Sequence, residues 1–280
     1  MTRRHDLERH RHSLGEIRSI LNSMKTLAYL ETRKLARRTA PQQGLVAHIV
    51  DSAQQLLAAW PQLLPDAGPG ESIGIVIGSE RGFCGDFNRS LVDLAVARQR
   101  AAPLQHWVLV GRRLQSLWPD AVAVDAALDG ASVAEELEAV RDAVVATLGR
   151  LRARLAPGPL QVLSHPVAGA PHWTTLLPPF QEPAPVAPPR EAPLLQLPPQ
   201  HLLLELTDQY LFAALNACMA DALMAESHQR VMHLERATQH LETQWQELGR
   251  RANTLRQEEI IEEIEVILLS AGAGDSGPHP

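Results

Sequence analysis

Cysteine is scarce in this sequence, which excludes a disulfide-stabilised fold. The 280 residues contain two cysteines, Cys84 and Cys218, a number typical of proteins from a reducing compartment. No stretch of about 20 consecutive apolar residues occurs, so we expect no membrane-spanning helix. The N-terminal stretch is basic and has no apolar run before Leu14, unlike a secretory signal. We therefore expect any association with a membrane to go through other proteins.

Signatures of catalysis and ligand binding are also missing. The spacing of Gly78, Gly82 and Gly85 does not match the dinucleotide-binding pattern, and no Lys-Ser or Lys-Thr pair completes a phosphate-binding loop. Cys84 has no neighbour in the sequence that would activate it as a nucleophile, and the 12 histidines form no set of metal ligands. We predict no catalytic residue, no metal site and no cofactor.

Charge is unevenly distributed along the chain. The net charge of −6 gives no reason to expect a nucleic-acid partner. Residues 1–38 contain ten lysines and arginines against four acids, a net of +6, whereas residues 201–265 contain twelve acids against five arginines, a net of −7. The two ends of the chain should therefore attract each other.

A long heptad repeat occupies the C-terminal part of the chain. Between Tyr210 and Leu269 there is no proline and one glycine, Gly249, so a helix of roughly 90 Å can form at about 1.5 Å per residue. The two apolar columns contain Ala217, Met224, Val231, Thr238, Trp245 and Ala252, and Ala220, Ser227, Leu234, Leu241, Leu248 and Leu255. Such a narrow seam suits one facing helix. The alternative is one core helix of a larger bundle.

The N-terminal region supplies a partner for that helix. Leu14, Leu21, Ala28 and Leu35 repeat in sevens, and we expect Ile17 and Met24 to fill the complementary column, with Ile20 and Leu27 widening it. We expect Pro41 and Gly44 to interrupt or bend the helix, which resumes until about Trp60. The sequence thus predicts a long antiparallel two-helix coiled coil formed by the N- and C-terminal helices.

The central part of the chain changes to a strand and helix alternation. Predicted strands cover residues 73–77, 105–110, 121–124, 160–164 and 172–177, and predicted helices cover 88–100, 112–117 and 132–155. The last helix should begin with a capping box of Ser132 and Glu135. This alternation predicts a Rossmann-like α/β domain inserted into the coiled coil. The predicted division is 1–70 for the first helix, 71–199 for the α/β domain with a proline-rich linker, and 200–280 for the long C-terminal helix.

A loop after the first predicted strand resembles a family motif. Residues 79–88 read Ser-Glu-Arg-Gly-Phe-Cys-Gly-Asp-Phe-Asn, which is similar to the S/T-D-R-G-L-C-G-x-L/F-N loop of the gamma subunit of F-type ATP synthases. The matching positions include Arg81, Gly82, Cys84, Gly85 and Asn88. Residues 20–28 and 226–264 resemble two further family segments in the same order, so the resemblance covers nearly the whole chain. Glu80, Glu235, Ile261 and Glu262 depart from the family pattern.

The resemblance implies a non-catalytic rotor shaft. In that family the terminal helices turn inside a ring of alpha and beta subunits, and the α/β domain sits with the epsilon subunit on the membrane ring of c subunits. The implied location is the cytoplasmic side of a bacterial plasma membrane, with contact to the membrane only through partner subunits. The implied contacts with the alpha/beta ring are Met24, Lys25, Arg33, Lys34, Arg37, Arg38, Arg230, Arg256, Gln257, Ile260, Ile264 and Ile267.

Other interpretations of the sequence stay open at this point. A variant sodium-linked F-type ATPase would account for the departures from the family pattern. A coiled-coil adaptor whose α/β domain binds a small ligand is a different class of function, and a nucleotide-dependent enzyme is a third. An adaptor should be well behaved as a homo-oligomer, whereas a rotor shaft should be stabilised by alpha and beta subunits.

Overall fold

The chain forms two compact units in the computed structural model. The structure describes residues 2–66, 68, 70–181 and 194–273, and the side chains of residues 2–4, 38–41 and 269–273 lie outside the description. The terminal unit contains Met1–Thr26 and Met232–Pro280, and the central unit contains Leu27–Val231. Two long helices, α1 (Thr2–Ala59) and α5 (Pro199–Ala273), contribute residues to both units.

A five-stranded sheet lies in the central unit. Its order is β3-β2-β1-β4-β5, and its strands are β1 (Ile73–Ile77), β2 (His106–Val110), β3 (Ala126–Leu128), β4 (Leu160–Ser164) and β5 (His172–Leu177). β1 pairs in parallel with both β2 and β4, with Ile75 opposite Val108 and Val162. β3 is parallel to β2, and β5 pairs with β4 in the antiparallel direction. The result is a mixed sheet whose inner strands are parallel.

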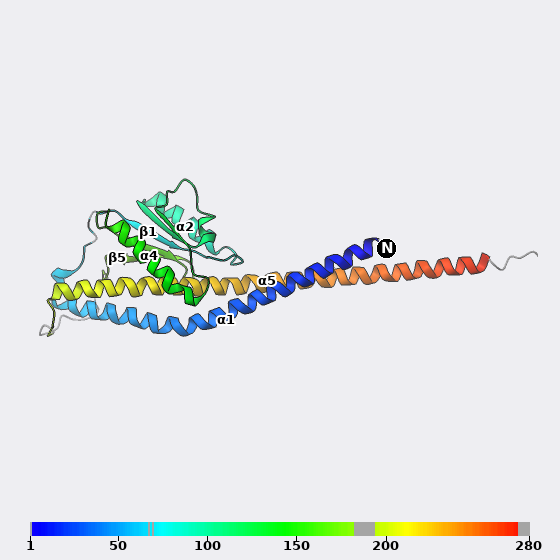
Figure 1. Ribbon diagram of the computed structural model, residues 1–280, viewed down its shortest axis with the longest axis horizontal. Coiled ribbons are helices and arrows are strands. Elements are labelled where there is room, and N and C mark those ends of the chain that lie inside the picture. Colours follow the sequence, from blue (N-terminus) through cyan, green and yellow to red (C-terminus); the bar gives the residue numbers. More distant parts are fainter. Residues whose placement is uncertain (1, 67, 69, 182–193, 274–280) are drawn as a thin grey trace, which may run out of the picture. The chain divides into compact units, whose positions relative to one another are not determined.

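Helices cover both faces of this sheet (Figure 1). α2 (Phe87–Ala101) and the short α3 (Arg112–Gln115) pack on one face, and α4 (Leu137–Arg152) and α5 pack on the other. Two short 3₁₀ helices, η1 (Pro61–Leu63) and η2 (Ala134–Glu136), complete the regular elements. Layers of this kind arise because a parallel strand pair needs a crossover connection that covers the sheet.

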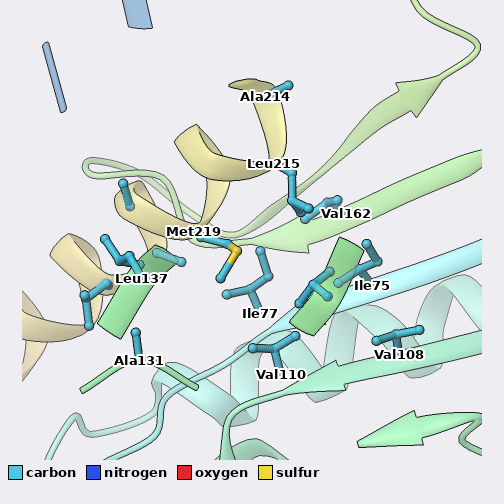
Figure 2. Close-up of a cluster of buried hydrophobic side chains, with 14 of the residues drawn as sticks. Ile75, Ile77, Val108, Val110, Ala131, Leu137, Val162, Ala214, Leu215 and Met219 are labelled. Atoms are coloured by element: carbon cyan, nitrogen blue, oxygen red, sulfur yellow. The ribbon is translucent and has the colours of Figure 1, made fainter. Parts of the chain in front are cut away.

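Strand β1 shows how the two cores form. All five of its residues are buried, and alternate side chains point to opposite faces of the sheet. Ile75 and Ile77 join the core beneath α4 and α5, whereas Val76 joins the core beneath α2. Figure 2 shows Leu215 and Met219 of α5 beside Ile77 and Val162 of the sheet.

α1 and α5 contact each other within each unit. In the central unit, Ala53 and Leu56 of α1 share a core with Leu203 and Leu206 of α5, and further along Gln43 lies 3.5 Å from Asp221. In the terminal unit, Lys25 pairs with Glu235 and Arg18 with Glu242. Within each unit, residues with higher numbers in α1 therefore contact residues with lower numbers in α5.

Most strand and helix positions agree with the predictions, and three differ. The third strand lies at Ala126–Leu128, not at 121–124, because its edge pairing with β2 decides its position. The helix predicted for 132–155 is α4 preceded by η2. Its capping contact is also different: the Glu136 carboxylate accepts a hydrogen bond from the Ser132 backbone at 2.6 Å, whereas Glu135 pairs with Lys34 of α1.

Of the interruption or bend expected at Pro41 and Gly44, the interruption is wrong, since α1 continues from Thr2 to Ala59. Buried α1 residues on either side, Leu35 and Ala53, pack into cores of the central unit that include α5 residues, and this packing outweighs the local preference of proline and glycine. The predicted linker at 178–199 falls mostly on residues 182–193, outside the described part of the chain.

Candidate functional site

The terminal unit has a narrow apolar seam on α5. Leu234 and Ala252 are buried, and Thr238, Leu241, Trp245, Leu248 and Leu255 are half-buried, whereas most positions between them are exposed. These positions follow the predicted heptad columns. On α1 the seam contains the buried residues Leu14 and Leu21. The contact therefore uses one narrow face of each helix.

The complementary column predicted on α1 holds for Met24, which is half-buried, and is wrong for Ile17 and for the widening residues Ile20 and Leu27. Ile17, Ile20 and Leu27 have 42%, 59% and 64% of their surface exposed. The column flanking Leu14 and Leu21 instead consists of the half-buried Arg11, Arg18 and Lys25. A heptad pattern alone does not distinguish these columns, because long basic side chains can also cover an apolar seam with their aliphatic parts.

Basic side chains of α1 join the two helices in the terminal unit. The Lys25 Nζ atom lies 2.6 Å from Glu235 Oε2, and Arg18 pairs with Glu242. The guanidinium carbons of Arg11 and Arg18 lie 4.1 Å and 5.1 Å from the ring centroid of Trp245. The hydrogen bond from Lys25 lowers the pKa of Glu235. Opposite charge and cation–π contacts thus replace a second apolar column.

The predicted ring contacts at the ends of the helices lie on exposed surface. Arg256 and Gln257 of α5 are exposed, and Ile260, Ile264 and Ile267 are 46%, 50% and 63% exposed. Met24 of α1 is half-buried. An apolar helix end of this kind is suited to burial by another protein.

The basic cluster of α1 lies in the central unit, where its members have different surroundings. Arg33 is exposed, with its guanidinium 5.9 Å from the ring centroid of Tyr29, and Arg37 is exposed. Lys34 forms an ion pair with Glu135. Arg38, also a predicted ring contact, lies outside the described side chains.

The family-like loop follows β1 and is held by its own side chains. The Asn88 side chain accepts a hydrogen bond from the Ser79 backbone at 2.9 Å and donates to the Ser79 hydroxyl at 2.8 Å. A Cβ atom at Gly78 would lie 2.4 Å from Cβ of Leu114, so only glycine fits at the end of the strand. Phe83 and Gly85 have positive φ angles of 64° and 63°. The surrounding bonds thus hold the loop in a conformation that a free chain would rarely adopt.

Glu80 connects the loop to two neighbouring loops at the carboxyl ends of the strands. Its Oε2 atom accepts hydrogen bonds from the backbone of Arg112 at 3.1 Å and of Gly130 at 2.7 Å. These residues follow β2 and β3, at the edge where open parallel sheets usually bind ligands. The Glu80 carboxylate therefore occupies the backbone N–H donors that a nucleotide phosphate would need at this edge of the sheet.

Arg230 and Glu226 of α5 bind the same loop. Arg230 donates from Nε to the Gly82 carbonyl at 3.0 Å and from Nη2 to the Arg81 carbonyl at 3.4 Å, and it pairs with Glu226. Glu226 is 2% exposed; burial raises its pKa, and Arg230 together with the nearby Arg81 and Glu80 backbones opposes this rise. Sequence reasoning placed Arg230 at the ring and missed this contact, because its partners are backbone groups far away in the sequence.

The two cysteines lie in surroundings that make the thiols unreactive. Cys84 is buried in the loop, and burial raises its pKa. Burial also raises the pKa of Cys218 to about 11. A thiol with a raised pKa carries little thiolate at neutral pH, and the thiolate is the nucleophile. Neither cysteine has the surroundings of a catalytic nucleophile.

Two structural features bear on metals and membranes. Among the residues that the structure describes, no three His, Cys, Asp or Glu side chains come together in a group that could hold a metal ion. Within the same residues, no helix combines the length and the apolar character needed to cross a bilayer.

Comparisons with known proteins place this fold in a family. No curated protein matches the chain. A chain of the Euglena gracilis mitochondrial ATP synthase, in a structure of its OSCP, F1 and c-ring in rotational state 3, matches with a TM-score of 0.65 and 14% identity, covering 99% of this chain and 97% of that one. A chain of the rotor of the same synthase, in rotational state 1, matches with a TM-score of 0.61 and 14% identity, covering 92% and 99%.

A third structure has the same fold, and a family model extends the comparison to the sequence. A chain from the central stalk and c-ring of the Tetrahymena thermophila mitochondrial ATP synthase matches with a TM-score of 0.57 and 13% identity, covering 78% of this chain and 99% of that one. The family model described as ATP synthase matches residues 3–273. The chain therefore belongs to the ATP synthase family, in agreement with the gamma-subunit motif of residues 79–88.

Proposed function

We propose that this chain is the central-stalk rotor subunit of an F-type ATP synthase or ATPase. It couples rotation of a membrane c-ring to changes of nucleotide affinity in catalytic beta subunits. The observation that carries this proposal is the family match over residues 3–273. The fold likeness to chains from rotor and central-stalk structures supports it. The adaptor interpretation receives no support from these comparisons.

The shaft of this rotor is an antiparallel coiled coil of α1 and α5. The opposite order of contact positions supports this arrangement, with Lys25 on Glu235 and Arg18 on Glu242 in the terminal unit. The same order appears in the central unit. A seam confined to one narrow face of each helix keeps the pair slender, as a shaft inside a closed ring of subunits requires.

The contacts with the alpha/beta ring use residues that remain exposed in this chain. Arg256, Gln257 and the apolar end at Ile260, Ile264 and Ile267 fit a sleeve formed by partner subunits. On α1 the corresponding contacts are the exposed Arg33 and Arg37, the half-buried Met24, and Arg38, whose side chain lies outside the description. Lys25, Lys34 and Arg230 already have partners within the chain, so any ring contact of theirs shares those groups.

The α/β domain is the platform of the rotor and carries no active site. It binds the epsilon subunit and the c-ring. The chain divides into the first helix at 1–70, the α/β domain with its linker at 71–199, and the long C-terminal helix at 200–280. Nucleotide chemistry stays in the beta subunits. Glu80 supports this assignment, because its carboxylate accepts from backbone donors that follow β2 and β3.

The rotor works by reciprocal coupling between rotation and nucleotide affinity. An asymmetric shaft presents a different surface to each beta subunit and thereby favours a different conformation in each. Turning the shaft exchanges these conformations, and binding or release of nucleotide pushes the shaft in return. The complex is peripheral to the cytoplasmic side of a bacterial plasma membrane and reaches the membrane through its partners.

Co-expression with the alpha and beta subunits tests the rotor assignment. We expect size-exclusion chromatography to yield a complex whose ATPase activity depends on this chain. A chain that stays outside this complex and behaves well as a free oligomer would contradict the proposal and favour an adaptor.

A seam variant tests the shaft within the same assay. Replacing Leu241 and Leu248 by Asp should prevent assembly, because two charges then enter the apolar seam. Replacing the exposed Thr243 and Thr254 by Asp adds the same charge to the same helix and should leave assembly intact. Normal assembly of the first variant would refute the coiled coil.

A further inference from the structure

Among the described residues, three contacts join the α/β domain to α1 and α5 in the central unit, besides the cation–π contact of Arg141 with the Phe212 ring and the ring contact of Phe180 with Tyr210. The first is the apolar layer between the sheet and α5, which includes Leu215 and Met219 (Figure 2). The second is a polar contact of α1 with η2, where Glu31 accepts a hydrogen bond from the Ala134 backbone at 2.6 Å and Lys34 pairs with Glu135. The third is the contact of Glu226 and Arg230 with the loop.

The apolar layer resists separation better than it resists sliding. Its energy depends on buried area and has no preferred direction. Many of the α5 side chains in this layer are small, among them Ala214, Ala220 and Ala222. The alanines offer little to interlock with the sheet, whereas Leu215, Met219 and Leu223 do interlock with it, so the layer resists sliding in part. Directional bonds add to this resistance.

The ion pair of the α1 contact is exposed to solvent. Lys34 and Glu135 have side-chain exposures of 44% and 54%. Exposed ion pairs are weak and are screened by salt. The half-buried hydrogen bond from the Ala134 backbone to Glu31 is therefore the stronger part of this contact.

The α5 contact is both buried and directional. Glu226 and Arg230 have side-chain exposures of 2% and 8% and stand one helical turn apart. Arg230 donates to the Arg81 and Gly82 carbonyls, and Glu226 pairs with the Arg230 guanidinium. One turn of α5 thus binds two successive carbonyl groups of one peptide segment, and that segment cannot shift without breaking both bonds together.

The loop passes this constraint on to the sheet. Ser79 is tied to Asn88 at the start of α2, and Glu80 is tied to the backbones of Arg112 and Gly130. A continuous set of hydrogen bonds therefore runs from α5 to the ends of β1, β2 and β3. A buried ion pair adds little net stability compared with apolar packing, but it fixes geometry.

We propose that Glu226 and Arg230 are positioning residues that transmit torque between the α/β domain and the shaft helix α5. This inference rests on the proposed rotor function. Loss of either side chain lets the domain slip against α5 under load. The shaft formed by α1 and α5 would still turn in the alpha/beta ring. Less of its rotation would reach the c-ring through the α/β domain.

The test separates ATP hydrolysis from ion pumping in the assembled complex. Glu226→Gln and Arg230→Gln are compared with Glu205→Gln and Arg100→Gln, which remove the same charges at exposed positions of α5 and α2. Three quantities are measured: ATPase activity, ions pumped per ATP in membrane vesicles, and the rate of maleimide labelling of Cys84. Cys84 reports on the loop because it is buried there.

We expect near-normal ATPase activity in the Glu226→Gln variant, because Glu226 is not among the expected ring contacts, and the Arg230→Gln variant is judged by the ions pumped per ATP. Ions pumped per ATP should fall by about threefold or more, and Cys84 should be labelled faster, because the buried partner is left uncompensated. Arg230→Lys keeps the charge and one donor and should restore most of the coupling. The two control variants should match the wild type in all three measurements.

Two outcomes would overturn the torque assignment alone. Unchanged coupling together with faster Cys84 labelling would show that the contact carries no load. A parallel loss of assembly, ATPase activity and pumping, without rescue by Arg230→Lys, would show that the residues serve only folding. Failure of the wild-type chain to assemble with alpha and beta subunits is a separate result, and it would overturn the rotor proposal as well.

Discussion

Helix α5 is buried in different ways in the two units. In the central unit it has buried residues on several sides, among them Leu203, Leu215, Leu223 and Glu226. In the terminal unit, among the side chains described, only Leu234 and Ala252 are buried. The same helix is therefore a core element in one unit and a narrow seam in the other.

The difference follows from what covers the helix in each unit. In the central unit the sheet, α4 and α1 share cores with α5. In the terminal unit the side-chain contacts of α5 with another element are those with α1, such as Arg11 on Trp245 and Lys25 on Glu235, among the described residues. One facing helix buries one stripe and leaves the rest of the surface for partners. Packing on several sides thus fixes the position of α5 in the central unit. In the terminal unit most of the α5 surface is left available for partner proteins.

A leucine truncation in the core should have the largest effect. Leu215→Ala removes a fully buried side chain between α5 and the sheet, and we expect it to lower the free energy of unfolding of the central unit by roughly 2–5 kcal/mol. Urea unfolding followed by tryptophan fluorescence measures this loss. Leu204→Ala is the matched control on the same helix, because Leu204 is 64% exposed, and it should change the free energy by less than about 0.5 kcal/mol. Equal losses would contradict the assigned burial.

The same truncation in the seam should cost less. Leu241 is half-buried, so Leu241→Ala should destabilise the helix pair by roughly 1–2 kcal/mol. Hydrogen exchange read by mass spectrometry is the suitable measurement, because it reports local opening separately for each segment. Exchange should rise in the segments around residues 14–25 and 234–248 and stay unchanged in the sheet. A rise in the sheet peptides would mean that the two units unfold together.

The seam on α5 was predictable from sequence, and its partner on α1 was only partly so. A heptad column of Leu234, Leu241 and Leu248 has one apolar face to bury, so periodicity identifies it. On α1 two alternative stripes exist, one through Ile17 and one through Arg18. Which of the two stripes faces α5 depends on the acidic side chains and Trp245 of α5. The residue pattern of α1 alone does not contain this information.

The loop was recognised from its motif, but its contacts were not predictable. Arg230 binds carbonyl groups of Arg81 and Gly82, and backbone groups leave no trace in side-chain patterns. Strand β3 shows the same limit. The apolar run at 121–124 resembles a strand, yet pairing with β2 selects Ala126–Leu128, because register is a tertiary property.

His106 should contribute less to the stability of the central unit as pH rises above the ordinary histidine range. The hydrogen bond from His106 to Asp125, with Nδ1 and Oδ1 2.9 Å apart, raises the pKa of His106. Its contribution is fully present below about pH 6.5 and is lost as pH rises through the raised pKa. We expect a loss of less than about 1 kcal/mol, measured as the slope of the free energy of unfolding against pH. His106→Gln should flatten this slope, and His172→Gln, at an exposed position of β5, should leave it unchanged.

The terminal unit should respond to pH in the opposite direction and with the smallest effect. The Lys25 hydrogen bond lowers the pKa of Glu235, so this ion pair stabilises the helices at neutral pH, and its contribution is lost as pH falls through the lowered pKa. Because Glu235 is 45% exposed, high salt should screen the pair as well. Glu235→Gln should increase hydrogen exchange near residues 18–25 in low salt and make little difference in high salt. Glu247→Gln, at an exposed position of the same helix, should be neutral in both.

An equal effect of the two variants would mean that net charge alone, rather than the pair with Lys25, holds the seam. A difference confined to Glu235 and to low salt would instead show that the seam combines one apolar column with one ionic column, whereas α5 in the central unit depends on packing against the sheet.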